Sequence, residues 1–353
     1  MQERNFYTLE ASEKVLIFQD ISNRTGMPAF AVEKDWWVTQ ALTIIFEMEV
    51  GQSLVFKGGT SLSKAWKLIQ RFSEDVDLAI DRTFLGFKGN LSKKQRTNLR
   101  KQAGIFTTEP FYQELERRFI AKGFSDVRFE VVPADDSDQD PRIILIHYPN
   151  LIETPDYILP RVQIEIGCRS LREPYSLKRF GSLIDEIYED REFSYPLIDV
   201  PVVNPERTFL EKLFLLHEEF HRPLEKMRVD RLSRHLYDVH QLANSEVAEK
   251  AINNKELYEI IVSHRFTFSK VSGVDYNSLN PKTLDPTPIP EVIEAWKADY
   301  QKMREQMIYE EKPPTFDELL SSIEKLKVRL SKLDWDFSLE FPKRLWTRLL
   351  LHR

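Results

Sequence analysis

The sequence predicts an α+β fold in which a mixed sheet with flanking helices is followed by a helical region. Two observations carry this prediction. Short runs of β-branched and apolar residues lie between residues 53 and 167, interleaved with two helical segments. From residue 204 onward, apolar residues recur at helical spacing. We expect N-terminal helices over 1–50 that pack on an α/β domain over 51–203, and a helical domain over 204–353.

Composition restricts the class of protein. A chain of 353 residues suits about two domains, and its 42% hydrophobic share, with 23 Phe, is enough for a packed core. Cys168 is the only cysteine, which excludes an intramolecular disulfide framework. The first residues lack the layout of a signal peptide, and the most apolar run, 41–46, is too short to cross a bilayer. We therefore expect a soluble protein of a reducing cytoplasm, with no membrane association.

Local patterns place the elements of the first two regions. Residues 29–48 carry apolar residues at helical spacing, which predicts a long helix. Further helices are expected at 61–70 and 107–121, and a hairpin-like loop at 134–141. The expected strands, each bounded by Gly, Pro or Asp, are 53–56, 76–80, 127–132, 142–148 and 161–167.

The last region is read in the same way. The segment NPERTFLEKLFLLHEEFH (204–221) begins with Asn and Pro in cap-like positions and ends before Pro223, which predicts a helix. Residues 271–290 are rich in Pro and Asn and predict a loop. The segment 315–333 carries an apolar stripe that we expect to form core packing or a partner surface; it comprises Phe316, Leu319, Leu320, Ile323, Leu326, Leu330 and Leu333.

Charge is unevenly distributed along the chain, although the net charge is −6. Two basic clusters stand out, and either could contact phosphates or form an ordinary solvated helix face. The first, over 82–108, contains no acidic residue and comprises Arg82, Lys88, Lys93, Lys94, Arg96, Arg100 and Lys101. The second comprises Arg222, Lys226, Arg228, Arg231 and Arg234.

The segment FKGGTSLSKAWKLIQRFSEDVDLAI (56–80) carries the clearest chemical signal. It predicts a strand, a Gly-Gly turn, a helix and a second strand. Gly58 and Gly59 allow close backbone approach to a ligand. The helix that Thr60 and Ser61 open offers free N–H groups that suit a triphosphate. Asp75 and Asp77 are two residues apart on the next strand, so both carboxylates point the same way.

A third carboxylate is expected on a neighbouring strand. In RVQIEIG (161–167), Glu165 lies on the face opposite the apolar residues. Asp75, Asp77 and Glu165 together offer the hard oxygen ligands that one or two Mg²⁺ ions prefer. Glu165 could instead be a solvated strand residue, and the aspartates could be a surface pair.

These motifs resemble those of the AbiEii/AbiGii-type nucleotidyltransferases, which are toxins of bacterial toxin–antitoxin and abortive-infection (phage-defence) systems. The similarity begins with GGTSLSKAW and RFSEDVDLAI and includes VEKDWWVTQAL (32–42) and PRVQIEIGCRS (160–170). It continues with NPERTFLEKLFLLHEE (204–219) and RLSRHLYDVHQL (231–242), in the order of the family. The resemblance implies a polymerase-β-like nucleotidyltransferase sheet.

The resemblance also implies roles for individual residues. Asp75, Asp77 and Glu165 would hold metal, and the implied phosphate-binding positions are Gly58, Gly59, Thr60 and Ser61. Ser73 matches a family serine beside the active site, although it could simply be a turn serine. Lys212 would contact nucleotide phosphates with Asp238 as its partner; otherwise it is a surface lysine.

The function implied is that of a Mg²⁺-dependent nucleotidyltransferase toxin. It would transfer a nucleoside monophosphate from an NTP to an acceptor hydroxyl of RNA, such as the 3′ end of tRNA, and would have a cognate antitoxin. The basic stretch 82–108 is the candidate RNA surface. Two alternatives remain open at this stage: transfer to a protein hydroxyl, and a nucleotide-binding partner module without turnover.

A separate match, HEEFH over 217–221, has the form of the H-E-x-x-H zinc signature. On a helical wheel, however, His217 and His221 fall inside the apolar stripe of their helix. The usual extension to a third ligand is also absent, since Leu224 and Met227 occupy its places. We expect both histidines to be packed or hydrogen-bonded rather than bound to zinc.

Overall fold

The computed structural model describes residues 5–73, 75–154 and 158–342. Its contacts divide the chain into two compact units. Unit 1 consists of Met1–Thr208 and Tyr300–Pro314, and unit 2 consists of Phe209–Asp299 and Thr315–Arg353. The N-terminal helices and the α/β region therefore lie in one unit. The division falls at residue 208, five residues beyond the expected boundary, and a segment from the C-terminal third returns to unit 1.

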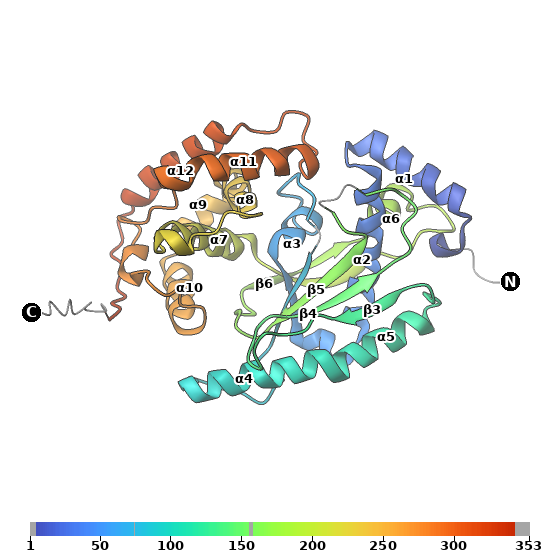
Figure 1. Ribbon diagram of the computed structural model, residues 1–353, viewed down its shortest axis with the longest axis horizontal. Coiled ribbons are helices and arrows are strands. Elements are labelled where there is room, and N and C mark those ends of the chain that lie inside the picture. The colour runs from blue at the N-terminus through green and yellow to red at the C-terminus, as the bar shows by residue number, and fades with distance from the viewer. Residues whose placement is uncertain (1–4, 74, 155–157, 343–353) are drawn as a thin grey trace, which may run out of the picture. The chain divides into compact units, whose positions relative to one another are not determined.

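A mixed seven-stranded sheet lies at the centre of unit 1 (Figure 1). The strand order is β3-β4-β5-β2-β1-β7-β6, and β2 runs parallel to β5 and antiparallel to β1. The strands are β1 (Leu54–Lys57), β2 (Asp75–Ile80), β3 (Arg128–Val131), β4 (Arg142–His147), β5 (Arg161–Gly167), β6 (Tyr175–Phe180) and β7 (Ile198–Val203). The structure confirms the predicted mixed sheet and the five expected strands, and it adds β6 and β7.

Both added strands lack the usual sequence signal of a strand. In β6, at the sheet edge, the apolar Tyr175 and Leu177 are exposed, so the alternation does not mark a buried face. β7 contains Pro201, which has no N–H to donate to a ladder and argues against a strand. β6 pairs with β7, and β7 pairs with β1, and these contacts place both strands in the sheet.

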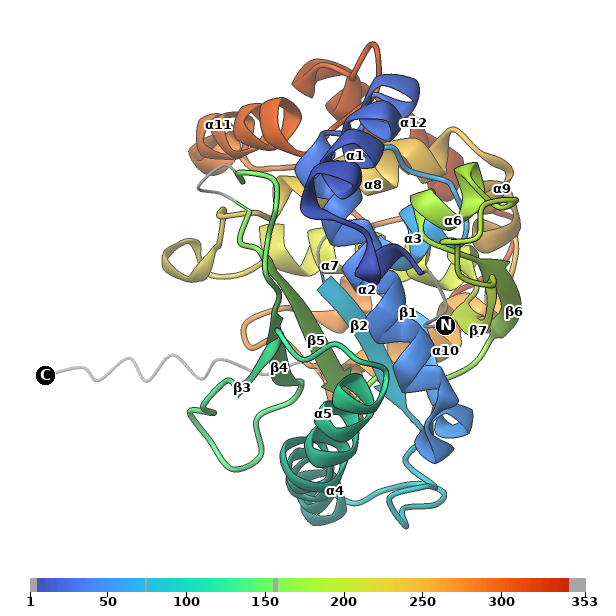
Figure 2. The ribbon, with the colours of Figure 1, turned by 90° about the vertical axis from the view of Figure 1, so that its right-hand side faces the viewer.

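Helices pack against this sheet, as two views at right angles show (Figures 1 and 2). α2 (Ala29–Glu47) contacts β5 and α5 (Tyr112–Ala121), and it is buried along most of its length. α1 (Ala11–Thr25) packs on α2, while α3 (Gly58–Lys64) contacts β1 and β2. α4 (Lys93–Phe106) continues through a π-helical turn, Thr107–Phe111, into α5.

Three charged residues of α2 anchor other segments, and of these Glu33 and Lys34 are buried and Asp35 is half-buried. The Glu33 carboxylate accepts hydrogen bonds from the N–H groups of residues 151 and 152. Lys34 Nζ donates to the carbonyl of Leu159 at 3.0 Å. Asp35 accepts from Lys64 Nζ at 2.6 Å and from the N–H of Leu183, the first residue of α6 (Leu183–Ile187), at 2.8 Å. The VEKDWW motif thus connects α2 to α3, to α6 and to residues 151, 152 and 159.

The helix expected at 61–70 is shorter than predicted. α3 ends at Lys64, and Lys67 adopts a left-handed backbone conformation with φ of 54°. The following residues pair with the returning segment of unit 1, since Phe72 N–H donates to Met307 O and Tyr309 N–H donates to Gln70 O. This long-range pairing takes the backbone groups that a longer helix would use, and it cannot be read from local spacing.

Unit 2 is helical. The helix predicted over 204–221 is present as α7 (Pro205–Phe220). The C-terminal stripe lies on α12 (Phe316–Ser331) except for Leu333, which follows it, and most of its residues are buried. The remaining helices are α8 (Ser233–Ala243), α9 (Glu246–Ile252), α10 (Lys255–Phe268) and α11 (Pro290–Gln306), of which α11 ends in unit 1. None of the helices in the described part of the chain has the length and apolarity needed to cross a bilayer.

Candidate active site

Two neighbouring strands bring the predicted carboxylates onto one face of the sheet. In the parallel pair of β2 and β5, Asp75 lies opposite Gln163 and Asp77 lies opposite Glu165. Paired residues of adjacent strands share a face, so the three carboxylates project to the same side. The residues between them are buried on the opposite side, which fixes this register.

The Gly-Gly turn after β1 lies directly against functional side chains. Gly58 has a φ of 81°, and a methyl group on it would overlap the carboxylate of Asp77. A Cβ on Gly59 would lie 2.6 Å from Nη2 of Arg71 and 2.9 Å from Oγ of Ser73. Glycine is favoured at Gly58 by its positive φ and by the contact with Asp77, and a side chain on Gly59 would displace Arg71 and Ser73.

The hydroxyl groups after the glycines are committed to the turn itself. Thr60 Oγ1 donates to the carbonyl of Asp75 at 2.5 Å, and Ser61 Oγ donates to the carbonyl of Gly58 at 2.9 Å. Both residues are buried. The helix also begins at Gly58, earlier than expected. Thr60 thus ties the turn to β2, and what this segment offers to a phosphate is backbone N–H rather than hydroxyl groups.

Negative charge accumulates on the carboxylate face. Burial, together with the nearby charges of Asp77 and Asp75, raises the pKa of Glu165 to about 7. Gln163 orients the same carboxyl group, since its Nε2 donates to Glu165 Oε1 at 2.8 Å. A carboxyl group with a pKa in this range can exchange a proton at neutral pH.

One residue of this face was not predicted from the sequence. Lys57, the last residue of β1, lies opposite Asp77 in the antiparallel pair with β2. Its Nζ is 3.9 Å from Asp77 Oδ1, and both side chains are largely buried. Its charge also lowers the pKa of Glu165, against the larger effects that raise it. Lys57 could have been found from its position in the sequence, because it directly precedes Gly58 at the end of the strand that leads to the turn.

The donor set of this face suits a hard divalent cation such as Mg²⁺. In the described ranges, no three His, Cys, Asp or Glu side chains gather closely enough to enclose an ion by themselves. Mg²⁺ does not require such a cage, because it is commonly held by one or two carboxylates together with substrate phosphates and waters. The raised pKa of Glu165 reflects repulsion among these crowded carboxylates. A bound cation would offset that repulsion, so the face is suited to a divalent metal ion.

Comparison with known proteins identifies the family. Residues 40–322 match the family model of the nucleotidyl transferase AbiEii toxin of type IV toxin–antitoxin systems. The chain belongs to the AbiEii nucleotidyltransferase toxin family. This confirms the resemblance found in the sequence and makes the protein a nucleotidyltransferase, with an NTP as substrate and an antitoxin as the partner that membership implies.

The AbiEii chain also resembles solved structures. It is similar to the nucleotidyltransferase toxin MenT4 from Mycobacterium tuberculosis H37Rv, with 16% identity and a TM-score of 0.47 over 92% of this chain and 91% of that chain. It is similar to JHP933 from Helicobacter pylori, with 15% identity and a TM-score of 0.37 over 83% of this chain and 92% of that chain. No curated protein matches it.

The AbiEii motifs in unit 2 place two further predicted residues together. Lys212 on α7 and Asp238 on α8 form an ion pair, with Nζ 2.8 Å from Oδ2. His235 Nδ1 lies 3.4 Å from the same Nζ. The Lys212 and Asp238 side chains are both buried, so the ion pair holds the Lys212 ammonium group in a fixed place on α7. Its role toward the phosphates of an NTP stays a prediction.

The first basic stretch forms much of α4 and the loop before it. Leu99, Ala103 and Gly104 face the interior. Among the cations, Arg96 donates to the carbonyl of Leu91, and Arg100 forms an ion pair with Asp138. The lysines are exposed, namely Lys88, Lys93, Lys94 and Lys101. The lysines, rather than the arginines, are therefore the accessible charges of this surface.

Two arginines of the second cluster and His217 make contacts within unit 2. Arg222 and Arg228 both form ion pairs with Glu219. Both ring nitrogens of His217 are hydrogen-bonded, one to the N–H of Asp285 at 2.9 Å and the other to Ser278 Oγ at 2.8 Å. Burial lowers the pKa of His217 to about 3. As expected, this histidine is packed and hydrogen-bonded.

Proposed function

We propose that this AbiEii-family toxin transfers a nucleoside monophosphate from an NTP to a hydroxyl group of RNA, in a Mg²⁺-dependent reaction. The observation that carries the proposal is the register of β2 and β5, which gathers Asp75, Asp77 and Glu165 on one face beside the Gly58–Gly59 turn. Transfer of a phosphoryl group depends mostly on positioning and charge stabilisation, which such a face supplies.

In this reaction the acceptor oxygen bonds to the α-phosphorus, while the bond from that phosphorus to the bridging oxygen breaks and pyrophosphate leaves. Asp75 and Asp77 would hold the metal, and Glu165 would complete the set or help to take the hydroxyl proton. Bound Mg²⁺ supplies positive charge that stabilises the phosphates. Lys212 adds a further cation toward the triphosphate.

The acceptor proposed is the 3′ end of tRNA. Support comes from the exposed lysines of α4 and its preceding loop, which offer contacts to a phosphate backbone. They form a patch in a chain whose net charge is −6, so the positive charge is local rather than general. A cognate antitoxin would counter this activity.

The test is a labelling experiment on the full-length protein. It is incubated with Mg²⁺, total bacterial RNA and each NTP in turn, labelled with ³²P at the α-phosphate. We expect label in a tRNA-sized band, sensitive to RNase and abolished by a chelator. The matched control is Asp75→Asn/Asp77→Asn, which keeps size but removes both charges and should leave the RNA unlabelled.

Other outcomes identify the alternatives. Label on a polypeptide that survives RNase would make the acceptor a protein hydroxyl and overturn the RNA assignment. Nucleotide binding without release of pyrophosphate, for all NTPs and acceptors, would leave a binding module and overturn the transferase mechanism for this chain.

A further inference from the structure

The carboxylate face of the sheet continues past β5 to the edge strand β3 (Figure 2). Arg161, four residues before Glu165 on β5, lies opposite His147 of β4, and His147 lies opposite Arg128 of β3. Alternate residues of one strand share a face of the sheet, and so do residues paired across strands. Arg161, His147 and Arg128 therefore form a basic row across three strands, on the same face as Glu165.

Arg161 is the member of the basic row that lies nearest the carboxylates. Asp75 pairs with Gln163, so Arg161 lies one alternate position, about 7 Å, further along β5 on the same face. The residue is half-buried. Its guanidinium group forms no hydrogen bond or ion pair with another residue of the described ranges. Its charge is thus available to a ligand that reaches the carboxylates.

The outer part of the basic row is more exposed. The Arg128 side chain is 66% exposed, against 26% for that of His147. Glu130 of β3 contacts both, since Arg128 Nη1 donates to its Oε2 at 3.3 Å and His147 Nε2 lies 2.9 Å from the same oxygen. The two arginines outnumber this single carboxylate, so the row keeps net positive charge. Basic groups in a line suit the phosphates of a nucleic-acid strand.

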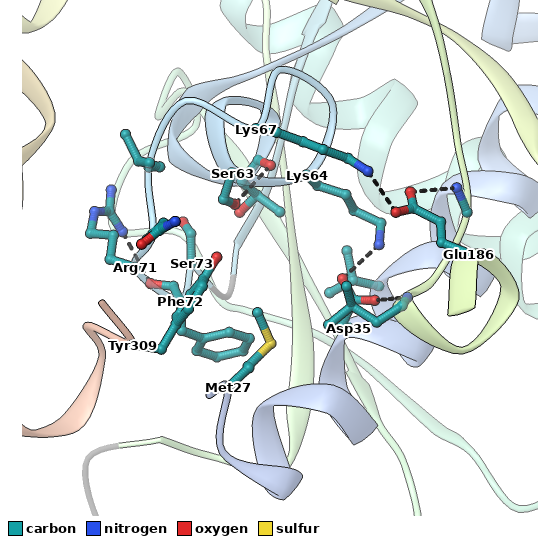
Figure 3. A pocket seen from close by; sticks show the side chains of 16 residues that line it. Met27, Asp35, Ser63, Lys64, Lys67, Arg71, Phe72, Ser73, Glu186 and Tyr309 are labelled. Carbon is teal, nitrogen blue, oxygen red and sulfur yellow. Dashed lines mark hydrogen bonds and ion pairs between the residues drawn. The ribbon is translucent and has the colours of Figure 1, made fainter. Parts of the chain in front are cut away.

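The β1 side of the site does not offer the same access. A cavity of about 220 Å³ lies there beside α3 (Figure 3). Its walls come from α2, α3, α6, the 67–73 turn and Tyr309 of the returning segment. Pockets for drug-sized ligands start near about 300 Å³, so the cavity is too small for an RNA strand. Figure 3 also shows two of its lysines paired within the protein, Lys64 with Asp35 and Lys67 with Glu186, each at 2.6 Å.

The order of the strands gives the acceptor a direction of approach. The Gly58–Gly59 turn follows β1 and lies against Asp77, whereas β5 lies on the other side of β2. We expect the phosphates of the NTP at this turn. In an in-line displacement the attacking oxygen enters opposite the leaving group. A diphosphate that departs on the β1 side therefore requires an acceptor that arrives from the β5 side, where Arg161 is the first cation of the basic row.

We propose that the acceptor RNA reaches the carboxylates across β3, β4 and β5, with the phosphates next to its reacting hydroxyl bound by Arg161 and Arg128. The inference rests on the proposed function and adds the direction of approach and the residues that position the acceptor. Arg161 holds the end of the strand beside the carboxylates, and Arg128 binds a phosphate further from the reacting hydroxyl.

The lysines of α4 then have a different role. A Cβ on Gly104 of α4 would lie 2.8 Å from Nε of Arg142, the first residue of β4. Arg142 pairs with Ile166, near the end of β5, whereas Arg161 is the first residue of that strand. α4 therefore lies toward the other end of the sheet from the basic row. It contributes general affinity for RNA, and the row positions the end that reacts.

The experiment measures transfer of ³²P label from the α-phosphate of an NTP to tRNA by the full-length protein, with separate KM values for tRNA and for NTP. Arg161→Met should raise the KM for tRNA about tenfold, the size of one hydrogen bond between charged groups, and leave the KM for NTP unchanged. Arg161→Lys, which keeps the charge, should restore most of the loss. A purely structural role for Arg161 would not produce this split between the two KM values.

Two edge arginines provide a matched pair of variants. Arg128 and Arg179 are both exposed, on the opposite edge strands β3 and β6. The register of β6 with β7 and of β7 with β1 places Arg179 on the same face as Lys57, and thus as the carboxylates. Arg128→Gln should raise the KM for tRNA about threefold, as for an exposed ion pair, and Arg179→Gln should leave it unchanged.

Binding of labelled tRNA, followed by fluorescence anisotropy at several salt concentrations, gives a readout that does not depend on turnover. Each lost contact to a single-stranded phosphate reduces the slope of log affinity against log salt by about 0.7. Arg128→Gln should show this reduction, and Arg179→Gln should not.

The remaining outcomes overturn the inference in distinguishable ways. A raised KM for NTP with an unchanged KM for tRNA would assign Arg161 to the triphosphate instead. Equal effects of Arg128→Gln and Arg179→Gln would refute the direction of approach. Normal labelling of tRNA, with unchanged KM and salt slope in the Arg161 and Arg128 variants, would remove this inference and leave the proposed function in place. Label on a polypeptide instead of RNA would overturn the proposed function and this inference with it.

Discussion

Lys57 lies opposite Asp77 in the antiparallel pair of β1 and β2, with Nζ 3.9 Å from Oδ1. The lysine therefore offsets part of the negative charge on the carboxylate face, which a divalent cation would also offset. The same positive charge repels an incoming cation and attracts a triphosphate. We therefore expect Lys57 to weaken metal binding and to favour binding of a triphosphate.

The first prediction is that Lys57→Met binds Mn²⁺ more tightly than the natural protein, by about tenfold in the absence of nucleotide, because a repelling charge is removed. The measurement is a titration with Mn²⁺ followed by electron paramagnetic resonance. Lys122→Met, which removes an exposed lysine from unit 1, is the control. Weaker Mn²⁺ binding by Lys57→Met would show that the lysine holds the aspartates in a metal-ready arrangement instead.

Gly58→Ala should damage both stability and the site. The added methyl group overlaps the Asp77 carboxylate and the backbone keeps a φ of 81°, so we expect a loss of about 2 kcal/mol in unfolding free energy and loss of metal binding. Denaturant unfolding and metal titration measure the two effects. Gly167→Ala is the control, since its methyl group meets only ordinary contacts at 3.6 Å or more. Equal behaviour of the two variants contradicts the packing argument.

The raised pKa of Glu165 predicts a pH dependence of stability in metal-free protein. Its pKa is about 7 in the folded state, against the ordinary value of 4.5 for a glutamate, so the folded protein binds more protons between these values. Stability should therefore fall as pH rises through this window, by at most about 3 kcal/mol. Unfolding free energies at several pH values check this, and Glu165→Gln should flatten the slope. If Glu165→Gln shows the same slope of unfolding free energy against pH as the natural protein, the pKa of Glu165 is not raised.

The ion pair of Lys212 and Asp238 should be strongly coupled because both side chains are buried. A double-mutant cycle with Lys212→Met and Asp238→Asn should give an interaction free energy above about 1 kcal/mol, with each single variant strongly destabilised. Glu246 and Lys250, an exposed pair of the same unit, provide the control cycle, in which we expect almost no coupling. Equal coupling in the two cycles would mean that burial does not strengthen the pair.

The RNA surface is tested by salt dependence. Replacing Lys93, Lys94 and Lys101 by Gln should weaken RNA binding and reduce the slope of log affinity against log salt by about 2, as expected for three lost phosphate contacts. Fluorescence anisotropy with labelled tRNA measures both. Lys325→Gln/Lys332→Gln, two exposed lysines of unit 2, is the control. An unchanged slope would exclude α4 as the RNA surface.

Sequence alone predicted the parts of the fold that local pattern determines. Five strands and the paired carboxylates of β2 were recognised because apolar alternation and turn residues mark them. β6 and β7 were missed because their place depends on pairing with each other and with β1, and because Pro201 and the exposed Leu177 obscure the pattern.

The residues of the candidate site were also predicted only in part. Motif order placed Asp75, Asp77 and Glu165, but the cation Lys57 was missed because only the register of β1 with β2 brings it to Asp77. Gly58, Gly59 and Thr60 were expected to hold phosphate, which stays a prediction, and the bond of the Thr60 hydroxyl to the Asp75 carbonyl could not be predicted from spacing. The cavity could not be predicted at all, since Tyr309 is 236 residues from Ser73 in the sequence.

The return of residues 300–314 to unit 1 has a consequence for synthesis of the toxin. The segment supplies Met307 and Tyr309, whose backbone groups pair with residues 70–72 beside the active site. At about 5–20 residues per second, the ribosome takes several seconds to extend the chain from residue 208 to 314. During that interval the nascent polypeptide has its carboxylate strands but lacks one wall of the cavity. A truncated translation product that ends before residue 300 would accordingly lack the backbone partners of residues 70–72.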